Sequence, residues 1–296
     1  MELTTEASNP DSADLDRLDT VQLVQLINAE DAKVATAVAE ATAPIAAAID
    51  VIAARLASGG RLVYVGAGTS GRLGVLDAAE CPPTFNADPG QVIGLIAGGQ
   101  QALTNPVEGA EDSPNYGDSD LNSIDLTAKD VVVGIAASGT TPYVLGALKY
   151  ARSVGAAAIG LACNRGAPIE EHVDIMISVV VGPEVLAGST RMKAGTATKM
   201  VLNMLTTGAM VRLGKTYGNL MVDLQATNAK LMQRTVRILQ QLTGLATDDA
   251  ESLLQRCDGE LKTAIVSARL NLPPGEARAK LKAAEGRLRM ALEEHE

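Results

Sequence analysis

The sequence is poor in aromatic residues. It has no tryptophan, one phenylalanine (Phe85) and five tyrosines among 296 residues. Proteins that hold single-stranded nucleic acid usually stack the bases on aromatic side chains, so this composition argues against that role. The formal net charge of −10 argues in the same direction, because nucleic acids and anionic membranes attract basic proteins. We expect neither nucleic acid nor membrane as a partner.

Cysteine and histidine are also scarce. Cys81, Cys163 and Cys257 fit neither a zinc spacing nor a disulfide framework, and the two histidines are His172 and His295. A metal site would therefore have to rest on carboxylates. No apolar run is long enough to span a bilayer, and the acidic, polar start of the chain is unlike a secretory signal. A cytoplasmic protein is expected.

What the chain does contain is an alternation of apolar strands and helices. Short, nearly continuous apolar runs predict buried parallel strands at 61–66, 92–97, 130–136, 156–162 and 174–181. Helices are expected at 70–79, 101–110, 141–153 and, as a short turn, 166–171. This alternation predicts an α/β fold with a five-stranded parallel, doubly wound sheet in the flavodoxin-like order 2-1-3-4-5.

Helical segments flank the predicted sheet on both sides. Before it, residues 1–59 would form an arm, a short helix over 20–28 opened by Asp19, and one long helix over 30–58. The sheet domain would span 60–244 and include a late helix over 222–242. Residues 245–296 would form a small three-helix module.

The chain is organised around residues 66–71 (GAGTSG), which follow the first predicted strand and open a helix. Glycines allow close approach to an anion, and the amides at a helix start point toward it. The spacing of Gly68 and Gly71 also occurs in dinucleotide-binding turns. However, the hydroxyls of Thr69 and Ser70 and the lack of an acid after the next strand argue against a dinucleotide. An ordinary strand-to-helix turn remains the simpler alternative.

A second hydroxyl-rich loop, residues 137–142 (ASGTTP), follows the third predicted strand. Strands one and three are neighbours in the predicted order, so both loops would face one ligand, and a phosphate on a small polar molecule fits them best. The alternative is two independently capped helices. The candidate ligands of the phosphate are Gly68, Thr69, Ser70, Ser138, Gly139, Thr140 and Thr141, with Arg191 and Lys193 as cations.

Two carboxylates stand out as candidate acid–base groups. Glu80 comes at the predicted end of a helix, before Pro82 and Pro83, and Glu111 follows the second strand and its expected helix. Taken alone, either could be a solvated turn residue.

These stretches together resemble the N-acetylmuramic acid 6-phosphate etherase family of the sugar-isomerase-domain superfamily. The resemblance covers nearly the whole chain, and its most specific parts are 79–85 (AECPPTF) and 189–196 (STRMKAGT). Other matching stretches are 66–73, 97–99, 111–113, 137–142, 183–186 and 222–224.

The resemblance implies a homodimeric lyase that uses no metal or organic cofactor. It would convert N-acetylmuramic acid 6-phosphate and water to N-acetylglucosamine 6-phosphate and D-lactate. The two catalytic glutamates of the family fall on Glu80 and Glu111, with Glu111 assigned to carbon 2 and Glu80 to the oxygen at carbon 3. A straight helix over 70–79 would rise about 15 Å and so separate Glu80 from the phosphate loop of its own chain. Either this helix is short, or Glu80 acts in the partner's site, and we favour the second.

Two other functions remain open on the same fold. One is an aldose–ketose sugar-phosphate isomerase, and the other is a non-catalytic sugar-phosphate-binding regulator. The paired glutamates favour an enzyme over a regulator, and the match around Cys81-Pro82-Pro83 favours the etherase over the isomerase.

Overall fold

The computed structural model describes residues 3–224 and 229–293. The chain divides into two compact units, which are described separately. The sheet unit comprises Met1–Ala79 and Gly90–Gly208, and the C-terminal unit comprises Glu80–Pro89 and Ala209–Glu296.

The sheet unit is built on five parallel strands, as predicted. They are β1 (Leu62–Gly66), β2 (Val92–Ile96), β3 (Val131–Ile135), β4 (Ala157–Ala162) and β5 (Ile175–Ser178). Their order is β2-β1-β3-β4-β5, and all neighbouring pairs are parallel, so the predicted topology is confirmed. β1, β3 and β4 are buried along their whole length, which explains why they read as continuous apolar runs.

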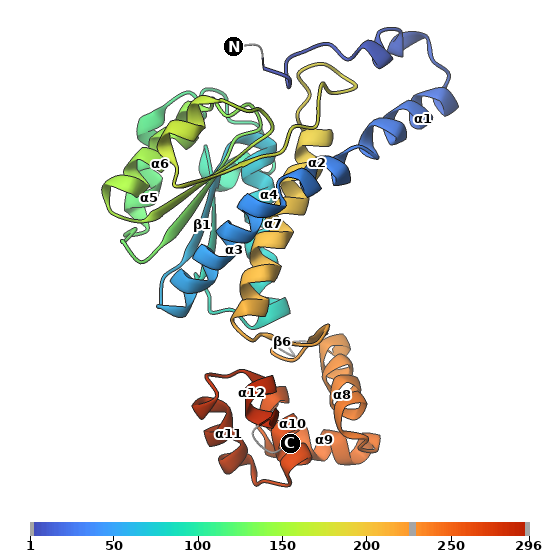
Figure 1. The fold of residues 1–296 in the computed structure, drawn as a ribbon, viewed down its shortest axis with the longest axis vertical. Coiled ribbons are helices and arrows are strands. Elements are labelled where there is room, and N and C mark those ends of the chain that lie inside the picture. The colour runs from blue at the N-terminus through green and yellow to red at the C-terminus, as the bar shows by residue number, and fades with distance from the viewer. Residues whose placement is uncertain (1–2, 225–228, 294–296) are drawn as a thin grey trace. The chain divides into compact units, whose positions relative to one another are not determined.

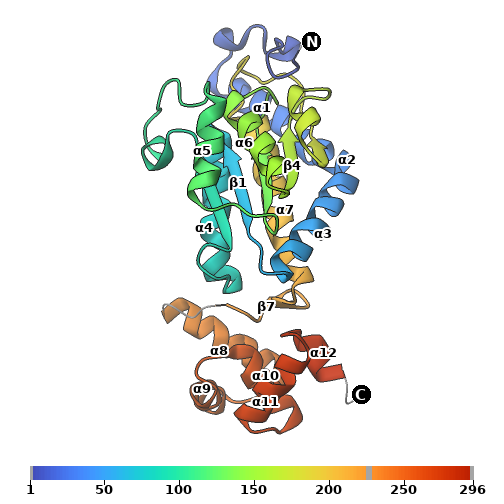
Figure 2. The same ribbon diagram turned by 90° about the vertical axis from the view of Figure 1, so that its left-hand side faces the viewer.

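Helices cover both faces of this sheet (Figures 1 and 2). On one face lie α5 (Pro114–Ser123) and α6 (Pro142–Ser153), and on the other lie α3 (Thr42–Ala57), α4 (Gly68–Phe85) and α7 (Lys193–Arg212). The side chains of alternate residues in β1 point to opposite faces of the sheet. Val63 and Val65 pack into the core under α5 and α6, whereas the Tyr64 hydroxyl reaches Asp77 of α4 on the opposite face.

The N-terminal helices differ from the prediction in one respect. Asp19 caps α1 (Thr20–Asp31) as expected, and its carboxylate accepts from the Gln22 amide at 2.8 Å. The single helix predicted over 30–58 is wrong, because the chain forms α2 (Val34–Glu40) and α3 with a break at Ala41. Pro44 is the physical reason. Inside one long helix it would clash with the carbonyl of Glu40, whereas in the first turn of α3 its missing N–H is harmless.

The first sheet helix, α4, is longer than predicted. The sequence predicts an end near Glu80, but the helix runs on through Pro82 and Pro83 to Phe85. The two prolines remove two backbone donors without ending the helix. Glu80 is therefore a residue within α4 rather than a residue of the loop that follows it.

The connection after β2 also corrects the prediction. Residues 101–110 do not form an α-helix: a 3-10 helix covers Gly99–Leu103 and turns follow. The α-helix of this connection is α5, which has Pro114 in its first turn. Glu111 thus lies before the helix, in the turns that lead into it. The short helix expected near 166–171 is present as a 3-10 helix, Pro168–His172.

The C-terminal unit is mainly helical and has its own core. The hairpin of β6 (Thr216–Tyr217) and β7 (Leu220–Met221) was not predicted. The helix expected over 222–242 begins at Ala229 as α8 (Ala229–Thr243), and residues 225–228, including Asn228, lie outside the described part of the chain. The module predicted over 245–296 has four helices rather than three in its described residues: α9 (Thr247–Arg256), α10 (Leu261–Leu270), α11 (Pro274–Ala283) and α12 (Leu288–Glu293).

Among the residues that the structure describes, no single helix is long and apolar enough to cross a bilayer. One bent pair of helices, Thr20–Glu40 with Thr42–Ala57, has the length and composition of a span, and only these two properties point to one.

Candidate functional site

The two predicted ligand loops leave neighbouring strands at the same edge of the sheet. In the parallel pairing of β1 with β3, Gly66 lies opposite Ile135, and both strands end there. The first loop, residues 66–71, and the second loop, residues 137–142, therefore start side by side. This edge, where the carboxyl ends of the strands lie, is the place where open α/β sheets bind ligands.

The first loop is a tight turn that only glycine allows. A Cβ atom on Gly71 would lie 2.6 Å from the carbonyl oxygen of Gly66, so the backbone there closes on itself. α4 begins at Gly68, whose φ of 51° suits glycine. Thr69 and Ser70 are half-buried in the first turn of α4, and the free amides of that turn point out of the helix end.

The second loop presents two linked hydroxyls. The Oγ of Ser138 lies 2.9 Å from the Oγ1 of Thr140, and the amide of Thr140 donates to the Ser138 Oγ at 3.2 Å. Gly139 has a φ of 77°, and a Cβ there would lie 2.4 Å from the Cβ of Ala167. Pro142 occupies the first turn of α6 as predicted, but Thr141 makes no side-chain cap to that helix.

Glu111 is held beside the second loop by its backbone. Its carbonyl oxygen accepts from the amide of Tyr143 at 3.0 Å, and Tyr143 is the second residue of α6. The Glu111 side chain is exposed. A cavity of about 430 Å³ lies next to this turn, lined by Gly98 and Gly99 after β2 and by residues 107–110 among others. Glu111 and the second loop therefore belong to one region of the sheet unit.

The predicted cations are placed very differently from each other. Arg191 is exposed, whereas Lys193 is 1% exposed and its Nζ lies 2.5 Å from a carboxylate oxygen of Glu30 in α1. Burial alone would raise the pKa of Glu30, but hydrogen bonds from Lys193 and Lys33 outweigh it and lower that pKa. The Lys193 ammonium is thus already paired inside the protein, whereas Arg191 is exposed.

The start of α7 lies next to the first loop. A Cβ on Gly195 would come 3.6 Å from the Cγ2 of Thr69. The carboxylate of Glu184 closes this helix end, because it accepts from the amides of Lys193 and Ala194 at 3.0 and 2.9 Å. Glu184 therefore satisfies the first donors of α7, which are then not available to an anion.

Glu80, the second predicted catalytic carboxylate, lies in the C-terminal unit, and its side chain is exposed. Three residues earlier in α4, the buried Asp77 accepts from Tyr64 at 2.9 Å, from Asn203 at 2.7 Å and from Thr206 at 3.3 Å. These contacts join α4 to β1 and α7 within the sheet unit. They fix which face of α4 is turned toward α7.

Comparison with known proteins decides the family. Two models of the SIS domain match residues 44–152 and 113–208, the first of them the N-terminal SIS domain of glucokinase regulatory protein. The C-terminal lid domain of glucokinase regulatory protein matches residues 218–269. A protein of Rhodopirellula baltica named N-acetylmuramic acid 6-phosphate etherase is 60% identical over 97% of this chain and 95% of its own length. The chain belongs to the N-acetylmuramic acid 6-phosphate etherase family.

Other members of the etherase family are nearly as similar. The protein of that name from Streptomyces coelicolor is 56% identical over 98% of this chain and 93% of its own length, and the one from Cronobacter sakazakii is 54% identical over 98% of both. A solved structure from Bacteroides fragilis, assigned as a phosphosugar isomerase involved in capsule formation, covers 66% of this chain and 91% of its own. Its TM-score is 0.51 and its identity 20%, so it supports the fold alone.

Two buried polar residues near the site of this etherase-family chain were not predicted from the sequence. Asn164 and Glu184 are 3% and 1% exposed, and both bond to backbone at the carboxyl edge of the sheet. Asn164 comes two residues after the buried strand β4, and the rule that singled out Ser138 after β3 would have found it. Glu184 lies inside a matching stretch but gives no signal of its own, because its partners lie nine and ten residues away at the start of α7.

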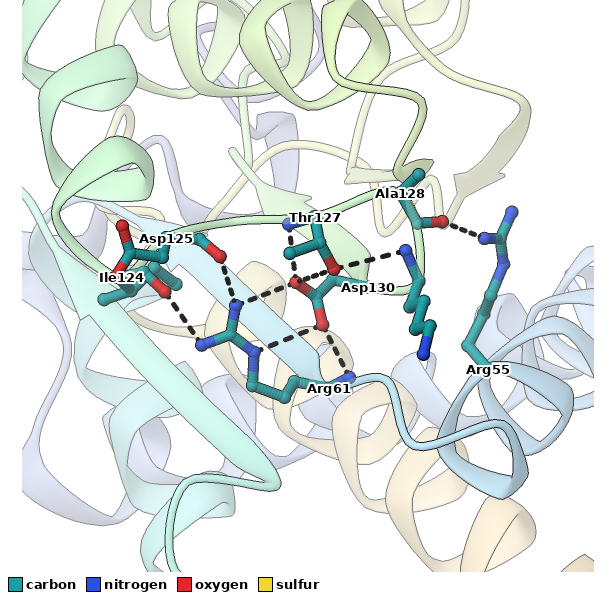
Figure 3. Close-up of polar contacts among 8 residues, drawn as sticks. Arg55, Arg61, Ile124, Asp125, Thr127, Ala128 and Asp130 are labelled. Carbon is teal, nitrogen blue, oxygen red and sulfur yellow. Dashed lines mark hydrogen bonds and ion pairs between the residues drawn. The ribbon is translucent and has the colours of Figure 1, made fainter.

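The opposite edge of the sheet holds a different kind of cluster (Figure 3). Arg61 precedes β1 and Asp130 precedes β3, and their side chains meet at 2.8 Å. The Arg61 guanidinium also donates to the carbonyls of Ile124 and Asp125, and Asp130 accepts from Thr127. Burial alone would raise the pKa of Asp130, but the hydrogen bonds from Arg61 and Thr127 outweigh it and lower that pKa. This cluster is internally satisfied and offers no donor pattern for a ligand.

Proposed function

We propose that this protein cleaves the D-lactyl ether of N-acetylmuramic acid 6-phosphate and, with water, yields N-acetylglucosamine 6-phosphate and D-lactate, a step in the recycling of cell-wall sugar. The identity of 60% over nearly the whole chain to a protein named for this activity carries the proposal. The arrangement of the sheet unit supports it, because Glu111 is tied to the first turn of α6 next to a hydroxyl-rich loop.

The phosphate of the substrate would bind at the two loops. In the pair of Ser138 and Thr140 one hydroxyl donates to the other, which leaves one hydroxyl proton for the phosphate. The first turn of α4 adds backbone amides beside Thr69 and Ser70. Arg191 would add a positive charge, since it is exposed whereas the nearby Lys193 is buried. Binding energy from a phosphate remote from the reacting carbons can hold the sugar in its reactive open-chain form.

The reaction itself needs two proton transfers at neighbouring atoms. In the open-chain sugar the lactyl oxygen is attached to carbon 3, which is β to the aldehyde carbonyl. Glu111 would remove the proton from carbon 2, and the resulting enolate would expel lactate as the bond between carbon 3 and oxygen breaks. Glu80 would give a proton to the departing lactate oxygen. Each positioned transfer typically contributes about 100- to 10,000-fold.

The second half of the reaction reverses these roles. The elimination leaves an unsaturated aldehyde with a double bond between carbons 2 and 3. Water adds at carbon 3 while Glu80 accepts its proton, and Glu111 returns a proton to carbon 2. Atoms and charges balance without an added oxidant or reductant. This chemistry needs no metal or organic cofactor.

We further propose that the working enzyme is a cytoplasmic homodimer in which Glu80 serves the partner's site. Glu80 comes twelve residues after Gly68 in α4, which is about 18 Å along a helix axis. Val21 and Val24 of α1 are 65% and 60% exposed, an unusual exposure for valines on one helix. A largely apolar groove of about 700 Å³ between α2, α3 and α7 gives a second copy a surface to pack against.

The direct test is to incubate the protein with N-acetylmuramic acid 6-phosphate and measure D-lactate. We expect stoichiometric lactate and N-acetylglucosamine 6-phosphate. No lactate from folded protein would exclude the etherase. A ketose phosphate as product would favour the isomerase, and tight binding without turnover would favour the regulator.

The roles of the two glutamates can be distinguished by measuring exchange of the carbon 2 proton of the product sugar phosphate in heavy water. Proton NMR follows this exchange. Glu111→Gln should abolish both lactate release and exchange at carbon 2. Glu80→Gln should release lactate very poorly yet still exchange that proton, because the enolate can form and be quenched. Asp112→Asn, a neutralised carboxylate next to Glu111, is the matched control and should retain both activities. Exchange lost only in Glu80→Gln would reverse the assignment.

The shared site is tested by mixing two variants of strongly reduced activity. Hybrids of Glu80→Gln subunits with Ser70→Ala/Ser138→Ala subunits would contain one site in which every part is intact. We expect clearly higher activity in such hybrids than in either parent. Hybrids no more active than the parents, verified by mass, would mean that each site is built from one chain.

A further inference from the structure

The N-terminal arm, residues 3–9, crosses the carboxyl edge of the sheet and is tied to two loops there. Thr5 is 1% exposed and Asn9 is 7% exposed, which is unusual for polar residues so near a chain end. The Asn9 side chain donates to the carbonyl of Pro183 at 3.4 Å. A Cβ on Gly188 would lie 3.5 Å from the Oε2 of Glu6. The arm is therefore a packed part of the sheet unit.

Asn164, after β4, is the residue that receives the arm. Its Oδ1 accepts from the amide of Thr4 at 2.8 Å and from the Thr4 hydroxyl at 2.7 Å. Its Nδ2 donates to the Oγ1 of Thr5 at 3.1 Å. The side chain is 3% exposed, so these bonds are made away from water, where an unmade bond is costly.

The same amide group holds the second ligand loop. Its Nδ2 lies 3.2 Å from the carbonyl oxygen of Ala137 and 3.2 Å from that of Ser138. The Ala137 carbonyl also accepts from the amide of Cys163 at 2.9 Å. One buried side chain thus fixes both the arm and the two peptide groups that orient the Ser138 hydroxyl.

We propose that Asn164 is a positioning residue that couples docking of the N-terminal arm to phosphate binding at the Ser138 loop. The inference rests on the proposed function in that the loop binds the phosphate of the substrate. Asn164 has no need to touch the ligand. It acts because the arm supplies partners for its amide and thereby holds its Nδ2 against the two loop carbonyls.

Coupling of this kind is reciprocal. If the docked arm tightens phosphate binding by a given factor, bound phosphate must stabilise the docked arm by the same factor. A merely structural asparagine would affect folding without this reciprocity. The effect of the docked arm on phosphate affinity and the effect of phosphate on arm docking therefore give two independent measurements of the same coupling free energy.

The variants are Asn164→Ala and the milder Thr5→Val, which removes only the hydroxyl that accepts from Nδ2. Loss of hydrogen bonds among buried groups predicts about a 10- to 100-fold rise in KM for Asn164→Ala and about a threefold rise for Thr5→Val, with kcat at saturation changed less than KM. Asn122→Ala is the matched control, because Asn122 accepts from the exposed Tyr150 hydroxyl on the far side of α6. It should leave KM unchanged.

Phosphate binding and amide hydrogen exchange are measured without catalytic turnover. Calorimetry with N-acetylglucosamine 6-phosphate and with inorganic phosphate should show the same weakening as KM. Amide hydrogen exchange should show that phosphate slows exchange in residues 3–9 as well as in 136–141 of the unaltered protein. In Thr5→Val the effect on residues 3–9 should be smaller, which keeps the test valid if Asn164→Ala folds poorly.

Two results would overturn the inference. One is phosphate affinity in Thr5→Val and a folded Asn164→Ala equal to that of the unaltered protein. The other is phosphate protection of 136–141 with no effect on 3–9. Because these readouts need no lactate, failure of the etherase assay with coupling intact would count against the proposed function alone.

Discussion

The two edges of the sheet use polar side chains in opposite ways. At the amino edge, Asp130 is 1% exposed and accepts five hydrogen bonds from Arg61 and Thr127. At the carboxyl edge, Ser138 and Thr140 are partly exposed and bond mainly to each other. Polar groups that are fully paired stabilise the fold, whereas groups with hydrogen-bonding capacity left over can bind a ligand.

The difference follows from what the chain brings to each edge. Arg61 and Asp130 stand one residue before neighbouring parallel strands, so their side chains lie side by side and are of opposite charge. The carboxyl edge receives loops, helix starts and the N-terminal arm, and in the described part of the chain the hydroxyls of Ser138 and Thr140 there have no charged side chain as a hydrogen-bond partner. Substitutions at the two edges should therefore separate stability from binding.

The largest effect on stability is expected from Asp130→Asn. Removing this charge leaves the Arg61 guanidinium without its carboxylate and should lower the free energy of unfolding by about 3 kcal/mol. KM should stay unchanged. Chemical denaturation of the variant and of Asp125→Asn measures this, since Asp125 bonds Arg61 through its backbone carbonyl and should tolerate the change. A change in KM with normal stability would contradict the contrast between the edges.

The contribution of ionised Asp130 to the free energy of unfolding should decrease at low pH. The pKa of Asp130 is lower in the folded protein than its usual value, so its contribution is fully present above about pH 4 and is lost as pH falls through the folded pKa. The stability difference between the unaltered protein and Asp130→Asn should therefore shrink as the pH falls below about 4. Denaturation curves at several pH values measure it, and a constant difference would be inconsistent with a paired carboxylate.

At the carboxyl edge, Ser138→Ala should act on binding. Loss of a hydroxyl that donates to a phosphate should raise KM about tenfold, because hydrogen bonds to charged groups are stronger than neutral ones. Stability should change by less than about 0.5 kcal/mol. Ser153→Ala, at the other end of α6, is the control for steady-state kinetics. Unchanged affinity for the 6-phosphate would remove Ser138 from the site.

The smallest effect separates the two predicted cations. Arg191→Ala should raise KM only about threefold, since an exposed charge interacts weakly through water. Lys193→Met should instead lower the melting temperature, because it takes one partner from the buried Glu30. Kinetics and thermal unfolding of both variants check this division. A larger rise in KM for Lys193→Met than for Arg191→Ala would indicate that Lys193, rather than Arg191, interacts with the ligand.

Much of the sheet unit could be predicted because its signals are local. The strands are buried on both faces, so apolar runs marked all five of them, and Gly66 to Gly71 and Pro142 marked where helices begin. Two of the failures came where prolines compete with helical preference. Pro44 splits one predicted helix, whereas Pro82 and Pro83 do not end α4. A proline's effect depends on what else holds the helix, and for α4 the contacts of Asp77 with α7 are part of that.

The sequence by itself determined the order of the strands, the position of both hydroxyl loops and, through its motifs, the family. Those features depend on residue type and on spacing along the chain. Only the tertiary structure decided that Lys193 forms an ion pair with Glu30 and that Glu184 caps the start of α7. The same holds for the hydrogen bond of Asn164 to the N-terminal arm, 160 residues away in the sequence. The physical reason is that a side chain's availability depends on its partners, and partners distant in the sequence are set only when the chain has folded.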